Sequence, residues 1–325
     1  MTLYARIGNV AAIRKGSGRM KIRFRHLLVR GDHGFRLSRV HLTYLWRHNR
    51  IADLTAPKTL TEHVQRRKLA DRDPRFVRMA DKVAVKDHVS RTLGSHWVTP
   101  TLWRGIRLPI EPVWPMPFVI KSRHGCSQVF VVRTLADYTV ARRLARRWIG
   151  HTYGRWLDEW SYGQIPKGLL VEPFIGEGGA LPIDYKFFVF AGKVAFIQVH
   201  LARSTAHRWI VFDLDWCRVS LSTPDPDPPP PTRLSEMIEA AETLGAKFDF
   251  VRVDLYEVAS KPVFGELTFY PGSGLEKVQP EGLDLAMGSL WTAARQRARL
   301  SQERHELDPP SDAQIDTRWA RYSAS

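Results

Sequence analysis

The hydrophobic pattern divides the chain into two parts with different periods. Before residue 100, apolar residues recur at the spacing of helices, interrupted by Pro57 and by turn residues at 71–74. The predicted helices cover residues 37–48, about 60–69 and 76–92, with Thr59 or Thr61 as the N-cap of the second. We therefore expect a mainly helical region over 35–110. Residues 1–34 are basic, show no sustained period and are expected to form a flexible arm.

After residue 110 the pattern changes to short runs rich in β-branched and aromatic residues. The expected strands cover residues 118–121, 129–132, 169–172, 184–190, 194–200, 210–214, 250–258 and 263–269. Helical spacing returns over residues 137–149, 234–244 and 283–299. The proline-rich segment 222–232 is expected to be a loop, and residues 301–325 a polar tail. No internal repeat is visible, which excludes repeat architectures.

Composition places the chain among globular proteins. Its 325 residues are 44% hydrophobic and 25% charged, which is ordinary for a soluble protein of about two domains. No apolar run approaches the roughly 20 residues of a membrane-spanning helix, and residues 1–30 lack a secretory signal. Two cysteines, Cys126 and Cys217, are too few for a disulfide framework. These features predict a cytoplasmic protein.

Positive charge is concentrated in the first half of the chain. Residues 1–150 hold 31 basic and 9 acidic side chains, a net charge of +22, whereas residues 151–325 hold 18 and 24. Such a half attracts anions, which include nucleic acid, phospholipid surfaces and phosphorylated or acidic substrates. The alternative is an arginine-rich composition with a solvated basic face. Charge alone does not decide between these readings.

Two carboxylates face each other in the last predicted hairpin. Alternation places Arg252 and Asp254 on one face of the first strand, and Glu266 and Thr268 on one face of the second. If the strands pair, Asp254 lies opposite or nearly opposite Glu266 at ~5 Å, where like charges repel. A divalent cation would remove the conflict, and oxygen-only ligands favour Mg²⁺ over Zn²⁺. Alternatively, Arg252 neutralises one acid in an ordinary surface hairpin.

Two further segments carry weaker signals. Lys121 ends a strand before a small-residue loop around Gly125, where an ammonium and backbone N–H groups can contact a polyphosphate. Glu172 ends a buried strand and can offer partners to an adenine, while Asp184 can bond a ribose hydroxyl. The alternatives are a solvated loop lysine, a capping carboxylate, and a strand-edge ion pair between Asp184 and Lys186.

In their order along the chain, these segments resemble the TupA-like ATP-grasp family, which is linked to teichuronopeptide and other cell-surface polysaccharide biosynthesis. The resembling segments are residues 56–62, 81–88, 118–125, 160–175, 184–190 and 250–256. The resemblance covers about residues 40–291. It implies an α+β ATP-grasp fold, in which a small lid lobe at about 111–170 and a large metal-binding lobe at about 171–300 sandwich ATP behind the helical N-terminal region.

The resemblance also implies roles for individual residues. The expected nucleotide-binding residues are Lys82, Lys121, His124, Gly125, Cys126, Ser127, Glu172, Pro173, Phe174, Ile175, Asp184 and Lys186. The expected magnesium ligands are Asp254, Glu266 and Thr268, and the expected catalytic residues are Arg252, Lys186 and Lys121. The chain departs from the family pattern at Thr268, where related ligases often carry Asn, and at Ser127, which replaces the second glycine of the phosphate loop.

The implied activity is an ATP- and Mg²⁺-dependent ligase that joins a carboxylate to an amine through an acyl phosphate, in cell-surface polysaccharide or related biosynthesis. Its expected partners are ATP, an amino acid, and a glycan or other anionic acceptor. Alternatives are an ATP-grasp phosphotransferase and a basic nucleic-acid-binding protein, although no zinc-finger spacing or aromatic RNA-binding signature supports the latter. The basic residues 1–110 are expected to bind an anionic precursor or the inner membrane face.

Overall fold

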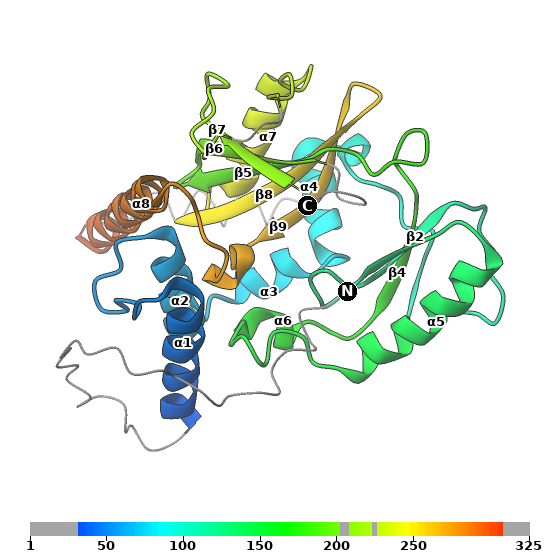
Figure 1. Cartoon of the computed structure of the whole chain (residues 1–325), viewed down its shortest axis with the longest axis horizontal. Helices are drawn as coiled ribbons and strands as arrows, with labels where there is room; N and C mark the ends of the chain where they lie inside the picture. Colours follow the sequence, from blue (N-terminus) through cyan, green and yellow to red (C-terminus); the bar gives the residue numbers. More distant parts are fainter. Residues whose placement is uncertain (1–31, 202–207, 223–225, 308–325) are drawn as a thin grey trace, which may run out of the picture.

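The computed structural model describes residues 32–201, 208–222 and 226–307 (Figure 1). The expected basic arm falls almost wholly outside the described residues, as does most of the expected polar tail. Between them the chain forms two antiparallel sheets with helices around each. Two separate hydrophobic clusters fill the interior, one under each sheet. The α+β class is therefore confirmed.

Helices form the N-terminal region, as the spacing predicts. They are α1 (Asp32–His48), α2 (Leu60–Ala70), α3 (Pro74–Ala80), α4 (Ala84–Leu93) and the 3₁₀ helix η2 (Ser95–Trp97). Thr59 is the N-cap of α2, and its side chain and that of Glu62 form a capping box. The single helix expected over 76–92 is wrong. Asp81 adopts an extended backbone, accepts a hydrogen bond from the Val83 N–H, and so separates α3 from α4.

The small sheet has four strands in the order β1-β4-β2-β3. They are β1 (Trp103–Gly105), β2 (Phe118–Ser122), β3 (Val129–Val132) and β4 (Leu169–Pro173). Helix α5 (Leu135–Gly150) packs its buried face, centred on Ala141 and Ala145, against this sheet. The sheet begins at β1, which the pattern did not reveal, so it extends beyond the expected limits of 111 and 170. Along the chain, helix α6 (Trp160–Gln164) follows α5 and precedes β4.

The large sheet has five strands in the order β7-β6-β5-β8-β9. They are β5 (Asp184–Phe190), β6 (Lys193–Leu201), β7 (Arg208–Phe212), β8 (Phe250–Val258) and β9 (Lys261–Thr268). Helix α7 (Leu234–Gly245) covers one face. Helices α2 and α8 (Glu281–Leu307) cover the other face near the start of β8. There the ring centroids of Trp291 and Phe250 lie 4.3 Å apart. Part of that second face remains polar, and it holds the candidate site.

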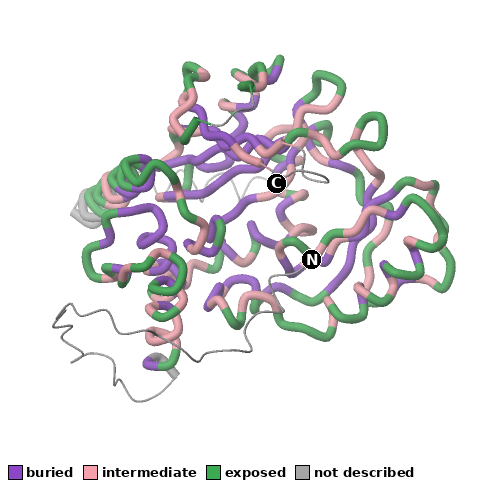
Figure 2. The backbone as a smooth tube through the Cα atoms, in the orientation of Figure 1, coloured by how far each residue is buried: buried purple, intermediate pink, exposed green. Residues whose placement is uncertain are grey.

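Burial follows this arrangement. Figure 2 shows the central strands of the large sheet buried along most of their length, whereas α5 and α8 expose one side to solvent. Beyond β9, the 3₁₀ segment η3 (Pro271–Gly274) turns the chain towards α2. Within the described ranges, no helix is long and apolar enough to cross a membrane.

Candidate nucleotide and metal site

Three neighbouring strands of the large sheet bring polar side chains onto one face. In the observed register, Lys186 of β5 pairs with Asp254 of β8, and Asp254 pairs with Glu266 of β9. The predicted opposition of the two carboxylates is therefore confirmed. The register shifts just after this pair, so that Gly265 bulges out of β9. A Cβ on Gly265 would lie 2.9 Å from the Asp254 carbonyl oxygen, so this bulge requires glycine.

Asp254 is the most enclosed group on this face. Its carboxylate accepts hydrogen bonds from Arg252 Nε at 2.7 Å, Arg252 Nη2 at 2.8 Å and Lys186 Nζ at 2.5 Å. Lys186 Nζ also lies 2.7 Å from Asp184 Oδ2. The ion pair between Arg252 and Asp254, one of the two readings of the hairpin, is thus present. Together with Lys186, it places two cations on a carboxylate that is only 1% exposed, so a metal ion would have to compete with these contacts for the same oxygens.

The Asp254 carboxyl and the Lys186 ammonium on this face are both stabilised in their ionised forms. Burial raises the pKa of the Asp254 carboxyl, but Arg252 and then Lys186 outweigh burial and place the pKa below its usual value. Burial lowers the pKa of the Lys186 ammonium, yet Asp254 raises it above its usual value. The face is therefore a fixed array of ionised groups at neutral pH. Such an array suits electrostatic stabilisation rather than proton transfer.

Glu266 is the accessible carboxylate of the pair. Its side chain is 29% exposed, and Oε1 lies 3.7 Å from Arg252 Nη2. The Thr268 hydroxyl donates to Glu266 Oε1 at 3.1 Å and accepts from Arg252 Nη2 at 3.2 Å. These contacts place the three expected metal ligands, Asp254, Glu266 and Thr268, around one guanidinium group.

Glu172 marks the part of the site built by the small sheet. Its buried carboxylate forms ion pairs with Lys86 and, at 2.6 Å, with Lys121. Burial raises the pKa of this carboxyl, but Lys121 and Lys86 together lower it below its usual value. Lys86 Nζ also donates to Thr99 O at 2.8 Å and to the Thr101 hydroxyl at 2.9 Å. An ammonium has three donors, so Lys86 is fully occupied while Lys121 retains two.

Lys86 is the residue that the sequence reasoning missed. Lys82, four residues earlier, was expected to contact phosphate, and its Nζ donates to the Gly125 carbonyl oxygen at 2.5 Å. Lys82 therefore contacts the predicted phosphate loop, whereas Lys86 reaches Glu172. In the helix expected over 76–92 the two lysines are one turn apart on one face, and this spacing was the available signal for Lys86.

The loop between β2 and β3 is fixed by its own contacts. His124 is 1% exposed, and its Nε2 lies 3.1 Å from Trp148 O while its Nδ1 accepts from the Gly168 N–H at 3.4 Å. The imidazole is thus committed to the small lobe and does not face the carboxylates. Arg123 forms a bidentate pair with Asp81. Ser127, which replaces a glycine of the family pattern, has φ 55°, a left-handed conformation that glycine adopts more readily.

Cys126 connects this loop to the large lobe. It packs against the large hydrophobic cluster beside Tyr153. Burial raises the pKa of the Cys126 thiol, and the negative charge of Glu266 raises it further. A thiol protonated in this way is a poor nucleophile.

The expected adenine hinge follows β4. Pro173 is the last residue of that strand, the Phe174 N–H donates to Pro117 O at 3.3 Å, and the Arg133 guanidinium lies over the Phe174 ring at 4.8 Å. Ile175 comes next and is half-buried. This segment is the covalent link between the two sheets, which is where a nucleotide held by both lobes would meet the backbone.

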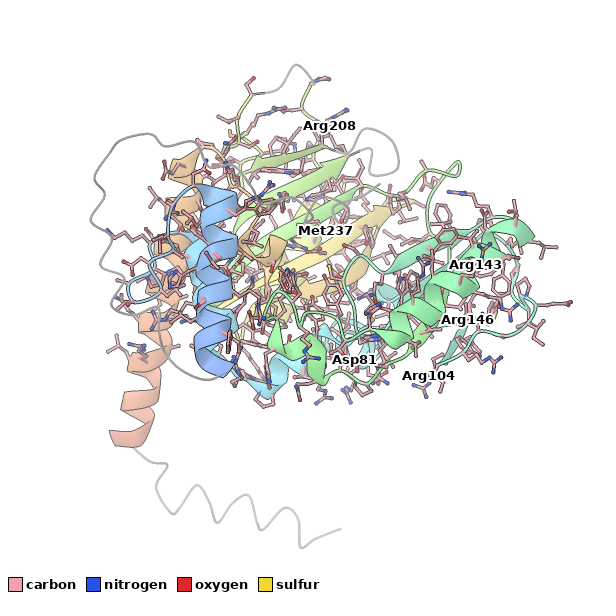
Figure 3. The ribbon with its side chains drawn as sticks, turned by 60° about the horizontal axis from the view of Figure 1, so that its bottom comes forward. Asp81, Arg104, Arg143, Arg146, Arg208 and Met237 are labelled. Atoms are coloured by element: carbon pink, nitrogen blue, oxygen red, sulfur yellow. The ribbon has the colours of Figure 1, made fainter. Side chains whose placement is uncertain are left out.

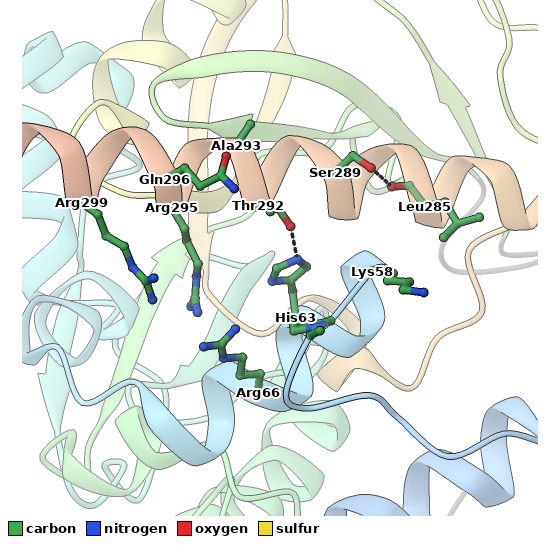
Figure 4. A pocket seen from close by; sticks show the side chains of 12 residues that line it. Lys58, His63, Arg66, Leu285, Ser289, Thr292, Ala293, Arg295, Gln296 and Arg299 are labelled. Atoms are coloured by element: carbon green, nitrogen blue, oxygen red, sulfur yellow. Dashed lines mark hydrogen bonds between the residues drawn. The ribbon is translucent and has the colours of Figure 1, made fainter.

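A cavity of about 610 Å³ lies elsewhere, between α2 and α8. His63 and Thr292, whose side chains lie 3.0 Å apart, line it together with Arg66, Arg295 and Arg299 (Figure 4). A smaller pocket reaches the candidate site itself, since Arg252 lines it together with Gln198 and Trp209. The polar face of the large sheet is therefore continuous with a pocket outside the carboxylate cluster.

The family model described as TupA-like ATPgrasp matches residues 62–292. The chain belongs to the TupA-like ATP-grasp family. The resemblance seen in the motifs is thereby confirmed, and with it the ATP-grasp fold. No curated protein matches the chain in sequence.

Solved structures of ATP-grasp ligases are distant from this chain. The D-alanine–D-alanine ligase from Bacillus anthracis complexed with ATP shares 14% identity and a TM-score of 0.45, over 69% of this chain and 68% of that one. The VanG D-Ala:D-Ser ligase from Enterococcus faecalis shares 13% identity and a TM-score of 0.42, over 67% and 61%. The ATP-grasp ligase PsnB complexed with a minimal precursor shares 11% identity and a TM-score of 0.38, over 67% and 62%.

The oxygen donors of this ATP-grasp face fit Mg²⁺. Asp254 and Glu266 lie opposite each other with the Thr268 hydroxyl beside them, and all three offer oxygen. Among the described residues, no group of three or more His, Cys, Asp and Glu side chains could hold a metal ion alone. Mg²⁺ seldom requires such a cage, because phosphate oxygens and water complete its octahedron. The face therefore suits a metal that arrives with a polyphosphate.

Proposed function

We propose that this protein is an ATP- and Mg²⁺-dependent ligase that joins a carboxylate to an amine through an acyl phosphate. Asp254 and Glu266, paired across β8 and β9 beneath Arg252 and Lys186, are the observation that carries the proposal. Phosphoryl transfer needs positioning and charge stabilisation rather than a nucleophilic side chain. This face offers fixed cations and two carboxylates, which are the groups that such a reaction requires.

ATP would lie between the two sheets. Lys121 would contact its phosphates with its two remaining donors, and the backbone of residues 173–175 would meet the adenine. Asp184 would bond the ribose, and the loop at 124–127 would cover the phosphates, through its backbone at His124 because that ring is occupied. Mg²⁺ held by Asp254 and Glu266, with Thr268 beside them, would neutralise charge on the phosphoryl oxygens.

The reaction would proceed in two steps. An oxygen of the substrate carboxylate attacks the γ-phosphorus of ATP, the bond to the β-phosphate oxygen breaks, and ADP leaves. Arg252 holds the carboxylate and then the acyl phosphate, while Lys186 and Lys121 stabilise the transferring phosphoryl group. The amine then attacks the acyl carbon, loses a proton, and expels inorganic phosphate to leave an amide.

The substrates would be an amino acid and a glycan or other anionic acceptor, as in cell-surface polysaccharide biosynthesis. The family match to the TupA-like ATP-grasp group supports this choice. We place the reaction in the cytoplasm, with peripheral contact to an anionic membrane. The concentration of basic side chains in residues 1–150 supports that contact.

The test is a screen for ADP release over pairs of carboxylates and amines. We expect ADP release to require both partners, and the product mass to equal the sum of the substrates less water. Release without an amine, with phosphate retained on the product, would show a phosphotransferase instead. If no pair and no single substrate releases ADP while RNA binds tightly, the protein is a nucleic-acid-binding one.

Lys121 provides a second test of the nucleotide site. We expect Lys121→Met to raise the KM for ATP ten- to a hundredfold, because a charge-assisted hydrogen bond contributes roughly 1.5–3 kcal/mol. Lys247→Met, at an exposed lysine near α7, removes the same charge and should leave the KM unchanged. The measurement is steady-state ADP release. An unchanged KM in Lys121→Met would place the phosphates elsewhere.

A further inference from the structure

The loop between β1 and β2 exposes a cluster of large aliphatic side chains. Ile106 is 70% exposed, Ile110 79% and Val113 74%. Single exposed apolar residues are common on soluble proteins, but a group of this kind on one loop marks an interaction site. No reaction step of the proposed function uses these side chains, and they lie outside the carboxylate cluster of the large sheet.

The loop is held against α5. Leu108, in the middle of the loop, is 5% exposed and packs with Ala141 and Ala145 of that helix. The Tyr138 hydroxyl of α5 donates to Pro109 O at 3.0 Å. Because these contacts fix the middle of the loop, its isoleucines and valine project outwards from a supported base.

Arginines lie on the elements that carry and support this loop. They are Arg104 of β1, Arg107 of the loop itself, and Arg142, Arg143, Arg146 and Arg147 of α5. Arg107, Arg142 and Arg146 line one pocket together with Ile106. Figure 3 shows Arg143 and Arg146 projecting from α5 on the outside of the small lobe. Within the part of the chain that the structure describes, none of the six forms an ion pair with a carboxylate, and Glu111 is the one acid in the loop.

We propose that this small-lobe face, defined as loop 106–113 and the arginines around it, docks the protein on an anionic phospholipid bilayer. Aliphatic side chains enter the boundary between headgroups and acyl chains, while guanidinium groups bind lipid phosphates. RNA fits the face less well, because single-stranded bases stack on aromatic rings rather than on isoleucine and valine. The combination of aliphatic tip and basic rim favours lipid.

This inference refines the membrane contact of the proposed function and assigns it to the small lobe rather than to residues 1–110 as a whole. It does not depend on the ligase reaction. Vesicle binding and ADP release are separate measurements, so failure of either one leaves the other informative.

The test is sedimentation of the full-length protein with vesicles of phosphatidylcholine alone or mixed with phosphatidylserine. We expect binding to the mixed vesicles at low salt and at least about a tenfold lower partition coefficient on neutral vesicles. The triple variant I106D/I110D/V113D should lose at least tenfold in partitioning. A variant with Gln at Arg142, Arg143, Arg146 and Arg147 should show an equal loss in its partition coefficient, and its binding should depend less on salt concentration.

Matched controls separate this face from general charge and hydrophobicity. L42D/L221D/L285D changes three exposed leucines elsewhere, and Gln replacements at Arg91, Arg233, Lys247 and Lys261 remove four charges elsewhere. The partition coefficients of both controls on mixed vesicles should lie within about twofold of that of the unaltered protein. Thermal unfolding checks that each variant folds. Equal binding of I106D/I110D/V113D and the unaltered protein would overturn the proposal. Binding to single-stranded RNA but not to vesicles would overturn it as well.

Discussion

Glu266→Gln is expected to lower the rate of ADP release about 10²- to 10³-fold, which is the usual effect of losing one major electrostatic contact to a transition state. The substitution keeps the shape of the side chain and removes one of the two charges proposed to hold Mg²⁺. Glu266 is preferred to Asp254 for this test, because its side chain is partly exposed and its loss leaves Arg252 and Lys186 paired with Asp254. Steady-state turnover with saturating ATP is the measurement.

Glu239→Gln is the matched control for this prediction. Glu239 lies on the exposed side of α7, so the same substitution there should leave turnover unchanged. Thr268→Ala should have a smaller effect than Glu266→Gln, since a hydroxyl supplies no charge. If Glu266→Gln turns over ATP at the normal rate with unchanged dependence on Mg²⁺, Glu266 is not a metal ligand.

Asp249→Asn is expected to destabilise the protein by about 3–5 kcal/mol, the usual result of removing one partner of a buried ion pair. Asp249 precedes β8 and ties two helices to the large sheet. It forms ion pairs with Arg67 of α2 and Arg295 of α8, and accepts from Trp291 Nε1 at 2.8 Å. Arg67 is fully buried, so the substitution would leave its charge with the longer 3.3 Å contact to Asp71 as its remaining carboxylate partner. Denaturant unfolding measures the loss, and Asp215→Asn, at an exposed position, should change stability by less than about 0.5 kcal/mol.

The same network predicts a dependence of stability on pH. Burial raises the pKa of Asp249, but Arg67 and Arg295 outweigh it and lower the pKa to about 2 from a usual value of 3.8. A carboxyl with a lowered pKa in the folded state stabilises above its unfolded pKa. Its contribution is therefore complete above pH 3.8 and is lost as pH falls towards 2. The difference in unfolding free energy between Asp249→Asn and the unaltered protein should shrink across this window, by roughly 2 kcal/mol. A constant difference would show that Asp249 acts through packing alone.

The sequence predicted a hairpin with Asp254 opposite or nearly opposite Glu266, and the structure contains it. Strict alternation over 250–258 and a turn before Val263 leave few registers, and the observed one sets Asp254 opposite Glu266. The bulge at Gly265 sets this pair, because the register that starts with Val258 opposite Lys261 would otherwise place Asp254 opposite Gly265. Of the two ion pairs of Asp254, the one with Arg252 was foreseen as an alternative and the one with Lys186 was not. Arg252 shares its strand face, whereas the contact with Lys186 depends on β5 lying beside β8, which only the tertiary fold establishes.

The rest of the site could not be predicted, because it depends on tertiary contacts that leave no pattern in the local sequence. Lys86 lies in α4, which is separate from α3 because Asp81 is extended and its side chain accepts from the Val83 N–H, and no helix-breaking residue marks that break in the sequence. His124 was assigned to the phosphates by its place in the loop, but its ring turns into the small lobe, where two backbone groups satisfy it. Strand β1 has three residues and is too short to show a period.

Two further ionisable residues are buried without any signal in the sequence. Lys68 of α2 and Glu159 before α6 lie in the interior between the helical region and the large lobe. Burial raises the pKa of Glu159 to about 7 and lowers that of Lys68 to about 8. Neither residue lies in a sequence pattern that distinguishes it from a surface charge, so their burial follows from the tertiary fold alone.

A crystal structure with a non-hydrolysable ATP analogue and Mn²⁺, located by its anomalous signal, tests the central claim most directly. The account predicts an ion between the strands β8 and β9, with carboxylate oxygens of Asp254 and Glu266 at about 2.0–2.2 Å and phosphate oxygens completing its shell. An ion bound through phosphate and water alone, with both carboxylates still held by Arg252 and Lys186, would contradict it.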